Sequence, residues 1–361
     1  MMRSLHIIGS RQFGGAENFF LRLVTALKSD PRQDPLVVIR PRSPLRGPLE
    51  KAGFPPFFVP MRNGWDLFSM WQIRRLIREQ KPRIVQTYMG RGTRLTRVPE
   101  NSGAVHVARL GGYYKIDGYY RHADAWIGNT RGLCDYLVKQ GLPARRVFPV
   151  GNFVPVSPAP TAEERTACRR EIGLPEDAWA LFTLGRLIAI KGFDELLQAF
   201  SRMPEAIGGR PLYLVIGGDG PLRQNLVDLA QSLGVEQRVI WPGWLNDPDP
   251  YFHAADLFVC PSRVETLGNV ILEAWAHGLP AVSTETPGGT ELIETGENGL
   301  LTPLEDPESL AGTCTELLGQ GAAVLDRLAR KGRETLERHH TREAVIGAYR
   351  EMYDQLVHRG D

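Results

Sequence analysis

LFVCPSRVETLGNVILEAW, residues 257–275, contains one complete unit of the fold that this chain is expected to adopt. Its first four residues are an apolar run typical of a buried strand, and a more polar loop follows them. Apolar residues then recur at the spacing i, i+3, i+4, i+7 and i+8 of a buried helix face, at Leu267, Val270, Ile271, Ala274 and Trp275. A buried strand that passes through a short loop into a helix is the unit from which parallel α/β sheets are built.

Similar units precede and follow this stretch. We predict strands at 5–8, 36–39, 57–60, 83–87, 105–110, 125–128 and 147–150 in the first half, and at 180–184, 212–216, 239–241, 257–260 and 281–284 in the second. Helices fall between them, for example at 16–27 and 67–79, and a last helix is expected over 341–357. This alternation predicts an α/β fold of two doubly wound, Rossmann-like domains that face each other.

A stiff connector separates the two predicted domains. The segment NFVPVSPAP, residues 152–160, has three prolines in six residues, which favours extended backbone over a helix or a central strand. We therefore expect an N-terminal domain over 1–152, a C-terminal domain over 153–340 and a C-terminal helix within 341–361. Ligands of such sheets bind beyond the carboxyl ends of the strands, so the expected site lies in the cleft between the domains.

The composition narrows the class of protein. Of the 361 residues, 42% are hydrophobic, and no run approaches the roughly 18–20 apolar residues that a membrane span needs. The N-terminal apolar run is too short for a signal peptide, and it is interpreted as a first strand. The four cysteines show no paired spacing, which favours a reducing cytosol over a disulfide framework. We therefore expect a cytoplasmic protein.

Charge is divided unevenly along the chain. Residues 1–150 hold 25 Lys and Arg against 10 Asp and Glu, a net +15, whereas the remainder carries a net −13. The basic half indicates an anionic partner, and charge alone leaves open whether this is nucleic acid, an acidic lipid surface or an acidic substrate. Solvated arginines scattered over the surface are the alternative interpretation.

Two carboxylates accompany the helix predicted within 257–275. Glu265 stands in the loop before it, and Glu273 lies off its apolar stripe near the second turn. Backbone amides at a helix start favour an anion such as phosphate, and here the candidates are Thr266, Leu267, Gly268 and Asn269. A carboxylate before the amides can accept hydrogen bonds from sugar hydroxyls, and one on the next turns can hold a ribose diol. A capping glutamate and a solvated glutamate are the structural alternative.

A pair of cations follows the strand predicted at 180–184. Gly185 comes directly after it, and Arg186 and Lys191 then stand five residues apart with no acid between them. Two cations at the carboxyl end of a strand suit a diphosphate. Two surface cations on a loop would give the same pattern, so this segment alone does not decide between the two interpretations.

Glycine turns follow two other predicted strands. Gly14 and Gly15 open the first helix, and Gly217 and Gly218 follow the strand at 212–216. Glycines there let backbone amides approach a phosphate or a sugar, so Gly14, Gly15 and Gly218 are candidate substrate contacts. Neither turn has the spacing of a dinucleotide fingerprint or a Walker loop, so each is equally compatible with a plain tight turn.

Together these motifs resemble those of retaining glycosyltransferases with the GT-B fold, above all the large bacterial branch that builds lipopolysaccharide and capsular glycans. They occur in the same order and at similar spacing: Gly14-Gly15-Ala16-Glu17, Gly185-Arg186-x4-Lys191-Gly192, Gly217-Gly218-Asp219-Gly220-Pro221 and Glu265-x7-Glu273. The resemblance covers nearly the whole chain, and its specific part is the pair of glutamates together with the Arg–Lys pair.

The resemblance implies a role for each of these residues. Arg186 and Lys191 would bind the donor diphosphate and Glu265 would contact the donor sugar, so we expect these three in catalysis. Glu273 would hold the nucleotide ribose, and the loop around Trp244 would line the nucleobase. The resemblance also implies a last helix that packs back on the first domain, a nucleotide-diphosphate sugar as donor substrate, and no cofactor.

One position departs from the family pattern. The family commonly places a histidine near the reacting centre, just after the strand predicted at 105–110, and Gly111 stands there in this chain. His106 lies inside the strand, which favours a structural role. The remaining candidates for substrate contact around this strand are Arg109, Tyr113 and Lys115, with plain surface positions as the alternative.

Asp247-Pro248-Asp249 has the form of the metal clamp of a different glycosyltransferase fold. Asp and Pro also start helices, and an apolar segment follows directly. We interpret these residues as a helix start and predict no metal site.

The sequence therefore predicts a metal-independent retaining glycosyltransferase that moves a sugar from a nucleotide-diphosphate sugar to an anionic glycolipid or glycan in lipopolysaccharide or other surface polysaccharide synthesis. We expect it to lie peripherally on the inner leaflet of the membrane, because clustered cations suffice for an anionic lipid surface, whereas no nucleic-acid recognition motif accompanies the charge. Two alternatives stay open: a catalytically inactive nucleotide-sugar sensor, suggested by the missing histidine, and an epimerase or phosphorylase on the same fold.

Overall fold

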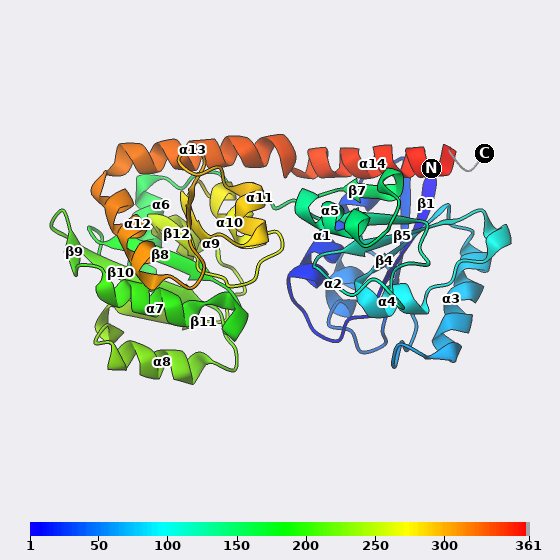
Figure 1. Cartoon of the computed structure of the whole chain (residues 1–361), viewed down its shortest axis with the longest axis horizontal. Coiled ribbons are helices and arrows are strands. Elements are labelled where there is room, and N and C mark those ends of the chain that lie inside the picture. Colours follow the sequence, from blue (N-terminus) through cyan, green and yellow to red (C-terminus); the bar gives the residue numbers. More distant parts are fainter. Residues whose placement is uncertain (359–361) are drawn as a thin grey trace. The chain divides into compact units, whose positions relative to one another are not determined.

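The computed structural model of the chain describes residues 1–358, which divide into two compact units (Figure 1). Unit 1 comprises Met1–Phe153 together with the last helix, α14 (Arg342–His358). Unit 2 comprises Val154–Thr341. The chain passes from one unit to the other within the proline-rich segment, one residue after the expected boundary. Both units are doubly wound α/β structures, which confirms the expected fold class.

Unit 1 is built on a parallel sheet with the strand order β3-β2-β1-β4-β5-β6-β7. Its strands are β1 (Met2–Ile8), β2 (Gln33–Ile39), β3 (Phe57–Phe58), β4 (Ile84–Tyr88), β5 (Val105–Leu110), β6 (Ala125–Gly128) and β7 (Val147–Pro149). Its other helices are α1 (Gly15–Lys28), α2 (Arg46–Lys51), α3 (Leu67–Gln80), α4 (Met89–Leu95) and α5 (Arg131–Lys139), with short 3₁₀ turns at Glu100–Ser102 and Ala144–Arg146. The strand order reverses between β1 and β4, where a doubly wound sheet forms its ligand crevice.

The sheet of unit 1 is covered on both faces. On one face, Ile8 of β1 and Val107 of β5 pack with side chains of α1 and α14. On the other face, Leu5 and Ile7 of β1 pack with Ile73 and Ile77 of α3. Strands buried on both faces are apolar at nearly every position, which is why they appear as continuous apolar runs in the sequence.

Unit 2 is also a parallel sheet, with the order β11-β10-β8-β12-β13-β14 and a short strand β9 antiparallel to β10. Its strands are β8 (Trp179–Leu184), β9 (Ala206–Ile207), β10 (Arg210–Gly217), β11 (Val239–Gly243), β12 (Leu257–Cys260), β13 (Ala281–Thr284) and β14 (Leu300–Thr302). Its helices are α6 (Ala162–Glu171), α7 (Phe193–Arg202), α8 (Arg223–Ser232), α9 (Asp249–Ala254), α10 (Asn269–Ala276), α11 (Pro287–Leu292), α12 (Pro307–Gly319) and α13 (Ala322–His339), with 3₁₀ turns at Ala189–Lys191 and Glu236–Arg238.

All predicted strands are present in the structure, and those at 105–110, 125–128, 257–260 and 281–284 have the predicted bounds. Two short strands, β9 and β14, escaped the sequence analysis because two or three residues carry too little periodicity. The predicted apolar stripe is buried apart from Val270, which is half-buried, and its first residue, Leu267, precedes α10. Its Trp275 lies against α13, where a methyl group at Gly332 would come within 2.3 Å of the indole.

A chain of buried hydrogen bonds ties α14 to the sheet of unit 1. The hydroxyl of Tyr353 donates to Oε1 of Gln86 at 2.6 Å, and Nε2 of Gln86 donates to the hydroxyl of Tyr88 at 2.6 Å. That hydroxyl is hydrogen-bonded to Nδ1 of His6 at 2.8 Å, and Nε2 of His6 to the hydroxyl of Ser4 at 2.9 Å. Buried polar groups are costly unless paired, so this chain fixes the position of α14 along the strands.

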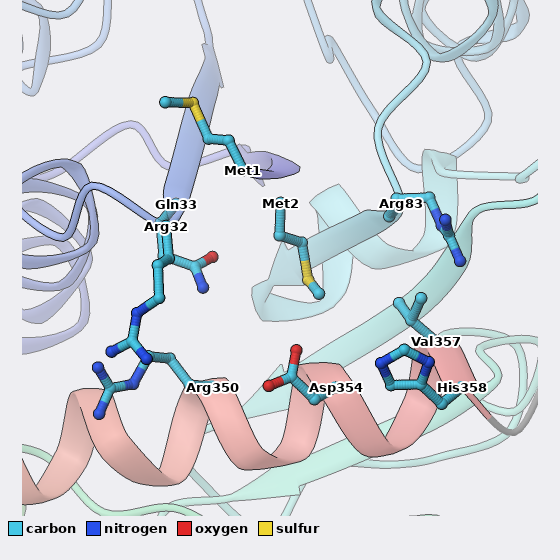
Figure 2. Close-up of a pocket in the computed structure, with 9 residues that line it drawn as sticks. All are labelled: Met1, Met2, Arg32, Gln33, Arg83, Arg350, Asp354, Val357 and His358. Atoms are coloured by element: carbon cyan, nitrogen blue, oxygen red, sulfur yellow. The ribbon is translucent and has the colours of Figure 1, made fainter.

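A cavity of about 400 Å³ lies between the C-terminal part of α14 and the amino ends of β1, β2 and β4 (Figure 2). It is lined by Met1, Met2, Arg32, Gln33, Arg83, Arg350, Asp354, Val357 and His358. The strands of the sheet are parallel, so the cavity lies at the edge formed by their amino ends. The substrate contacts are predicted at the opposite edge, formed by the carboxyl ends. None of the predicted site residues lines it.

Because His6 is buried, we predict that unit 1 becomes less stable as the pH falls. Burial lowers the pKa of His6 to about 3, so the folded protein keeps this ring neutral while the unfolded chain protonates it below about pH 6.5. Stability is therefore present above the unfolded pKa and is lost as the pH falls below it. We expect His6 to account for a loss of about 2 kcal/mol between pH 7 and pH 5.

Native-state hydrogen exchange of the β1 and β4 amides at both pH values measures this loss. His6→Gln should reduce the pH-dependent drop by that amount, whatever its effect at pH 7. His339, which is exposed, provides the control, and His339→Gln should leave the drop unchanged. An unaltered drop in His6→Gln would contradict the assignment.

Candidate functional site

The loops at the carboxyl edge of the unit 2 sheet are in close contact, and two glycines make this possible. Gly192, after β8, has φ +65°, and a methyl carbon there would lie 2.0 Å from the carbonyl oxygen of Pro261, after β12. Gly218, after β10, has φ +127°, and its methyl carbon would lie 1.9 Å from the carbonyl oxygen of Gly185. Only glycine tolerates both this backbone conformation and this proximity. The β8 loop is thereby held against the loops that follow its two neighbouring strands.

The crowding brings two of the predicted catalytic residues together. Nζ of Lys191 lies 2.5 Å from Oε2 of Glu265, and both side chains are largely buried. The hydroxyl of Ser262 lies 3.5 Å from the same carboxylate oxygen. The two charged residues are 74 positions apart in the chain, and they meet because β8 and β12 are neighbours in the sheet.

The surroundings of Lys191 keep it charged. Burial lowers the pKa of its ammonium, but the charge and hydrogen bond of Glu265 outweigh burial and leave the pKa above its ordinary value. The guanidinium of Arg186 acts in the opposite direction, so it is close enough to interact with Lys191. The stem of Lys191 also lies near Gly185, whose methyl carbon would be 3.7 Å from Cδ of the lysine. The predicted pair of cations is therefore brought into one region.

Two sets of contacts fix the loop that carries Glu265. Its peptide oxygen accepts a hydrogen bond from the amide of Gly288 in α11 at 2.8 Å, and the hydroxyl of Thr284 donates to the carbonyl of Ser262 at 2.5 Å. Gly268 has φ +81° and stands immediately before α10. The loop is thus held from the β13 side, and it delivers Glu265 beside the start of α10.

Arg263 is a positioning residue that the sequence analysis missed. Its guanidinium binds Asp194 at 2.8 Å and Glu195 at 2.7 Å, both in the first turn of α7. Its amide also donates to the carbonyl of Ile190 at 2.9 Å. These bonds hold the loop of Glu265 against the turn that carries Lys191. In the sequence, the only indication of these contacts is Arg263 within residues 257–275 and the two acids Asp194 and Glu195 soon after Lys191.

The other predicted residues of unit 2 lie on the same edge or on α10. Trp244 directly follows β11 and is exposed, and Arg186 is exposed two residues after β8. Glu273 is half-buried on α10, while Leu267 is part of the core. Thr266 and Asn269 are half-buried on either side of Leu267 and Gly268. Arg186, Lys191 and Glu265 thus lie in the loops that follow the neighbouring strands β8 and β12, and Glu273 lies on α10.

Unit 1 has its own group of candidates at the carboxyl edge of its sheet. Gly14 precedes α1 and Gly15 is its first residue. Tyr113 and Lys115 are exposed in the loop after β5, and the ring of Tyr113 packs edge-on against Tyr136 at 5.3 Å. Burial raises the pKa of Tyr114 and the nearby charge of Glu17 raises it further, so the loop after β5 lies near the start of α1.

Arg109 is not part of that group, and we correct its assignment from substrate contact to structural residue. It is only 6% exposed, and its guanidinium donates to the carbonyl of Val150 at 2.9 Å, the hydroxyl of Tyr349 at 2.8 Å and Oδ1 of Asn152 at 2.6 Å. Alternate residues of a strand point to the same face, and Val107 belongs to the core under α14. Arg109 therefore points into that core, where it holds residues 150–152 against α14.

His106 is structural, as predicted. Its ring is buried, and Nε2 lies 3.0 Å from the hydroxyl of Thr87 on β4. Burial lowers its pKa to about 3, so the ring is neutral at ordinary pH. A neutral, buried histidine in the middle of a sheet is not available to a substrate at the sheet edge.

The Asp-Pro-Asp segment starts a helix, which confirms our interpretation. Helix α9 begins at Asp249, and Asp247 accepts a hydrogen bond from the amide of Asp249 at 3.1 Å. The carboxylate of Asp249 is 3.0 Å from Nε2 of His277. Among residues 1–358, no three side chains of His, Cys, Asp or Glu are grouped closely enough to hold a metal ion.

Comparison with known proteins places these features in a family. Residues 164–335 match the family described as glycosyl transferases group 1, and residues 13–157 match glycosyltransferase family 4. The lipopolysaccharide core biosynthesis glycosyltransferase LpsE of Rhizobium meliloti is 33% identical over 341 residues, covering 94% of this chain and 95% of the relative. LpsD of the same organism, which carries the same description, is 29% identical over 357 residues and 99% of both chains.

Solved structures share the fold. HepE of Anabaena, crystallised with UDP and glucose, has a TM-score of 0.82 at 18% identity, covering 99% of both chains. The lipopolysaccharide outer core galactosyltransferase WaaB has a TM-score of 0.74 at 17% identity, covering 98% of this chain and 99% of the other. These similarities confirm the expected GT-B architecture.

The ion pair itself can be tested. Because Glu265 raises the pKa of Lys191, Glu265→Gln should lower that pKa, with burial now acting unopposed by the carboxylate. Reductive ¹³C-methylation of the lysines and NMR titration measure it, with Lys191→Arg used to assign the resonance. Glu297→Gln, which removes an exposed carboxylate of unit 2, should leave the resonance unchanged. A Lys191 pKa unaffected by Glu265→Gln would refute the pairing.

Proposed function

The chain belongs to the glycosyltransferases of group 1, and we propose that it is a retaining, metal-independent member that transfers a sugar from a nucleotide-diphosphate sugar to an anionic glycolipid or glycan of surface polysaccharide synthesis. The observation that supports this most directly is the ion pair of Lys191 and Glu265 beside the start of α10. A cation, a carboxylate and a helix N-terminus are groups that a sugar diphosphate can bind, which supports the proposal.

Unit 2 would bind the donor. Arg186 and Lys191 would hold the diphosphate, and the raised pKa of Lys191 ensures that it does so as a cation. Glu265 would accept hydrogen bonds from the sugar hydroxyls, and Glu273 would hold the ribose diol. The exposed Trp244 offers an aromatic face to the base. Uridine nucleotides are the first donors to try, because HepE was crystallised with UDP.

The proposed reaction needs charge stabilisation more than it needs a base. The bond between the anomeric carbon and the diphosphate oxygen breaks, and its electron pair goes to the diphosphate. The acceptor hydroxyl oxygen forms the new bond to the same face of that carbon, and its proton passes to the departing diphosphate. Arg186 and Lys191 would stabilise the charge that develops there, which is the service a metal ion provides in other enzymes.

Unit 1 would bind the acceptor. The excess of Lys and Arg over Asp and Glu in residues 1–150 favours an anionic acceptor, and a membrane lipid at the inner leaflet is the form that clustered cations recognise. Within residues 1–358, no helix has the length and apolar character to cross a bilayer. We therefore propose peripheral attachment, and we do not propose a nucleic-acid partner, since no recognition motif accompanies the charge.

Turnover assays decide between this proposal and its rivals. UDP-sugars are incubated with and without deacylated lipopolysaccharide core oligosaccharide as acceptor. Acceptor-dependent release of UDP with the sugar retained in the α-configuration supports the proposal. An epimerised sugar would indicate an epimerase, phosphate-dependent cleavage a phosphorylase, and binding without turnover a nucleotide-sugar sensor. Each of these three outcomes overturns it.

Removal of a donor contact should abolish transfer without unfolding the protein. Lys191→Ala and Glu273→Ala each remove a charge-assisted hydrogen bond to the donor, so we expect kcat/KM to fall by roughly 30- to 1,000-fold. Circular dichroism checks the fold, and both positions lie outside the core of unit 2. Glu297→Ala is the matched control and should retain full activity. Kinetics in both donor-contact variants equal to those of the unchanged protein would refute the site.

Chelation should not affect the reaction. We expect initial rates in excess EDTA to equal those in Mg²⁺, because side-chain cations would neutralise the negative charge of the diphosphate that a metal ion neutralises in other enzymes. The control is a metal-dependent glycosyltransferase assayed in the same buffers. Loss of activity in EDTA that Mn²⁺ or Mg²⁺ restores would show that the Asp-Pro-Asp segment, or another group, binds a metal.

A further inference from the structure

Helix α3 of unit 1 has an unusual outward face. Its buried residues Ser69, Ile73 and Ile77 form one stripe toward the sheet. Of its exposed residues, Glu79 lies near the C-terminal end, and the other six form a second stripe on the other side at the spacing i, i+1, i+4, i+7, i+8 and i+11: Leu67, Phe68, Trp71, Arg74, Arg75 and Arg78. The first three are apolar and the last three are arginines, so the outward stripe is apolar at the N-terminal end of the helix and cationic toward its C-terminal end.

Large apolar side chains are exposed to solvent at the N-terminal end of α3. Trp65, in the turn before the helix, is 77% exposed, Leu67 is 76% exposed, and Phe68 and Trp71 are each 54% exposed. The rings of Phe68 and Trp71 stack with centroids 6.1 Å apart. Single exposed apolar residues are common, but four large ones within seven positions form a patch that marks an interaction surface.

Cations surround this patch. The guanidinium of Arg94 lies 3.7 Å from the ring centroid of Trp65, and that of Arg75 lies 5.8 Å from Trp71. Between residues 62 and 94 there are eight Lys and Arg and two Asp and Glu. Both acids are occupied: Asp66 caps α3 and Glu79 pairs with Arg75 at 2.6 Å. We call Trp65, Leu67, Phe68, Trp71, Arg74, Arg75, Arg78 and Arg94 the aromatic–arginine face.

We propose that the aromatic–arginine face docks unit 1 on the headgroup region of an anionic phospholipid bilayer. The inference rests on the proposed function in one respect, that the acceptor is presented at a membrane. Tryptophan favours the boundary between headgroups and acyl chains, while leucine and phenylalanine favour the apolar side of it. Each arginine near an anionic surface adds electrostatic attraction, and its long stem lets the charge stay among the phosphates.

The distribution along the helix gives the orientation of docking. The helix rises about 1.5 Å per residue, so the arginine at 78 lies on the order of 10 Å along the axis from the tryptophan at 71. The end with Leu67 and Phe68 would enter the interface, while the arginines would remain at headgroup depth. A binding site for RNA or an acidic protein would use the same arginines, but it would leave exposed leucine and phenylalanine at the helix end without a function.

Vesicle sedimentation with matched variants tests the proposal. Vesicles contain phosphatidylglycerol and phosphatidylcholine in equal parts, or phosphatidylcholine alone. We expect binding to the anionic vesicles that weakens with salt, and about tenfold or greater loss of partitioning in Phe68→Ser/Trp71→Ser and in Arg74→Gln/Arg78→Gln. The controls are Phe58→Ser/Val138→Ser, two exposed apolar residues elsewhere in unit 1, and Lys139→Gln/Arg145→Gln, which removes the same charge elsewhere in unit 1. Both controls should bind within about twofold of the unchanged protein.

A second readout reports the depth of docking. Vesicles with brominated acyl chains should quench part of the tryptophan fluorescence, and Trp65→Phe/Trp71→Phe should remove the quenched part. Unaltered sedimentation of the face variants, equal losses in the controls, or no binding to anionic vesicles at low salt would each overturn the proposal. So would sedimentation of the unchanged protein with phosphatidylcholine alone as readily as with the anionic mixture, or competition by RNA that depends on the aromatic side chains.

Transfer to a soluble acceptor separates this proposal from the proposed function. The Phe68→Ser/Trp71→Ser variant should transfer sugar to deacylated core oligosaccharide at the unchanged rate, because these two side chains are neither donor contacts nor part of the positive charge proposed to attract the acceptor. Loss of vesicle binding with intact soluble transfer supports the docking face. Absence of soluble transfer in the unchanged protein, with vesicle binding still dependent on the face, would refute the proposed transfer from a UDP-sugar to the core oligosaccharide and leave docking supported.

Discussion

Close contact between loops at one sheet edge is the constraint on which the candidate donor site depends. The turn after β8 lies against the turn after β12 because Gly192 leaves room for the carbonyl of Pro261, and against the turn after β10 because Gly218 leaves room for Gly185. With these contacts in place, Nζ of Lys191 lies 2.5 Å from Oε2 of Glu265. Larger residues at either glycine would separate the loops and, with them, the charges.

The ion pair has a consequence for the chemistry that neither charge would have alone. Burial alone would lower the pKa of Lys191, and the neighbouring carboxylate of Glu265 raises it instead, so the lysine stays charged. Arg263 keeps the two loops in position through its bonds to Asp194 and Glu195. A donor with a negative diphosphate and neutral hydroxyls matches this arrangement, since it offers an anion to the ammonium and hydrogen-bond donors to the carboxylate.

Unit 1 places its charges differently. Among residues 1–358, most of its arginines are exposed and Arg109 is the one that is buried, where three carbonyl and hydroxyl oxygens and Asn152 accept its hydrogen bonds. The polar chain from Tyr353 to Ser4 likewise uses the interior of unit 1 for structural hydrogen bonds. The surface is left to carry the positive charge of this half of the chain, and on α3 that charge adjoins exposed aromatic rings.

The sequence by itself determined the elements and their class. Strands buried on both faces are continuous apolar runs, helices have a repeating apolar stripe, and residues that follow strands must lie at one edge of a parallel sheet. Arg186, Lys191 and Glu265 could therefore be placed at that edge in advance, while their roles rest on the resemblance to a family. The tertiary structure alone decided which of them meet. Strand order makes β12 the neighbour of β8, although three strands separate them in the chain, and this joins Glu265 to Lys191. Arg109 points into the core under α14, like Val107 on the same face of β5. One stripe of α3 packs on the sheet, and the other, with Trp71 and Arg78, stays uncovered. Periodicity shows only which residues share a face, whereas burial depends on what lies opposite that face.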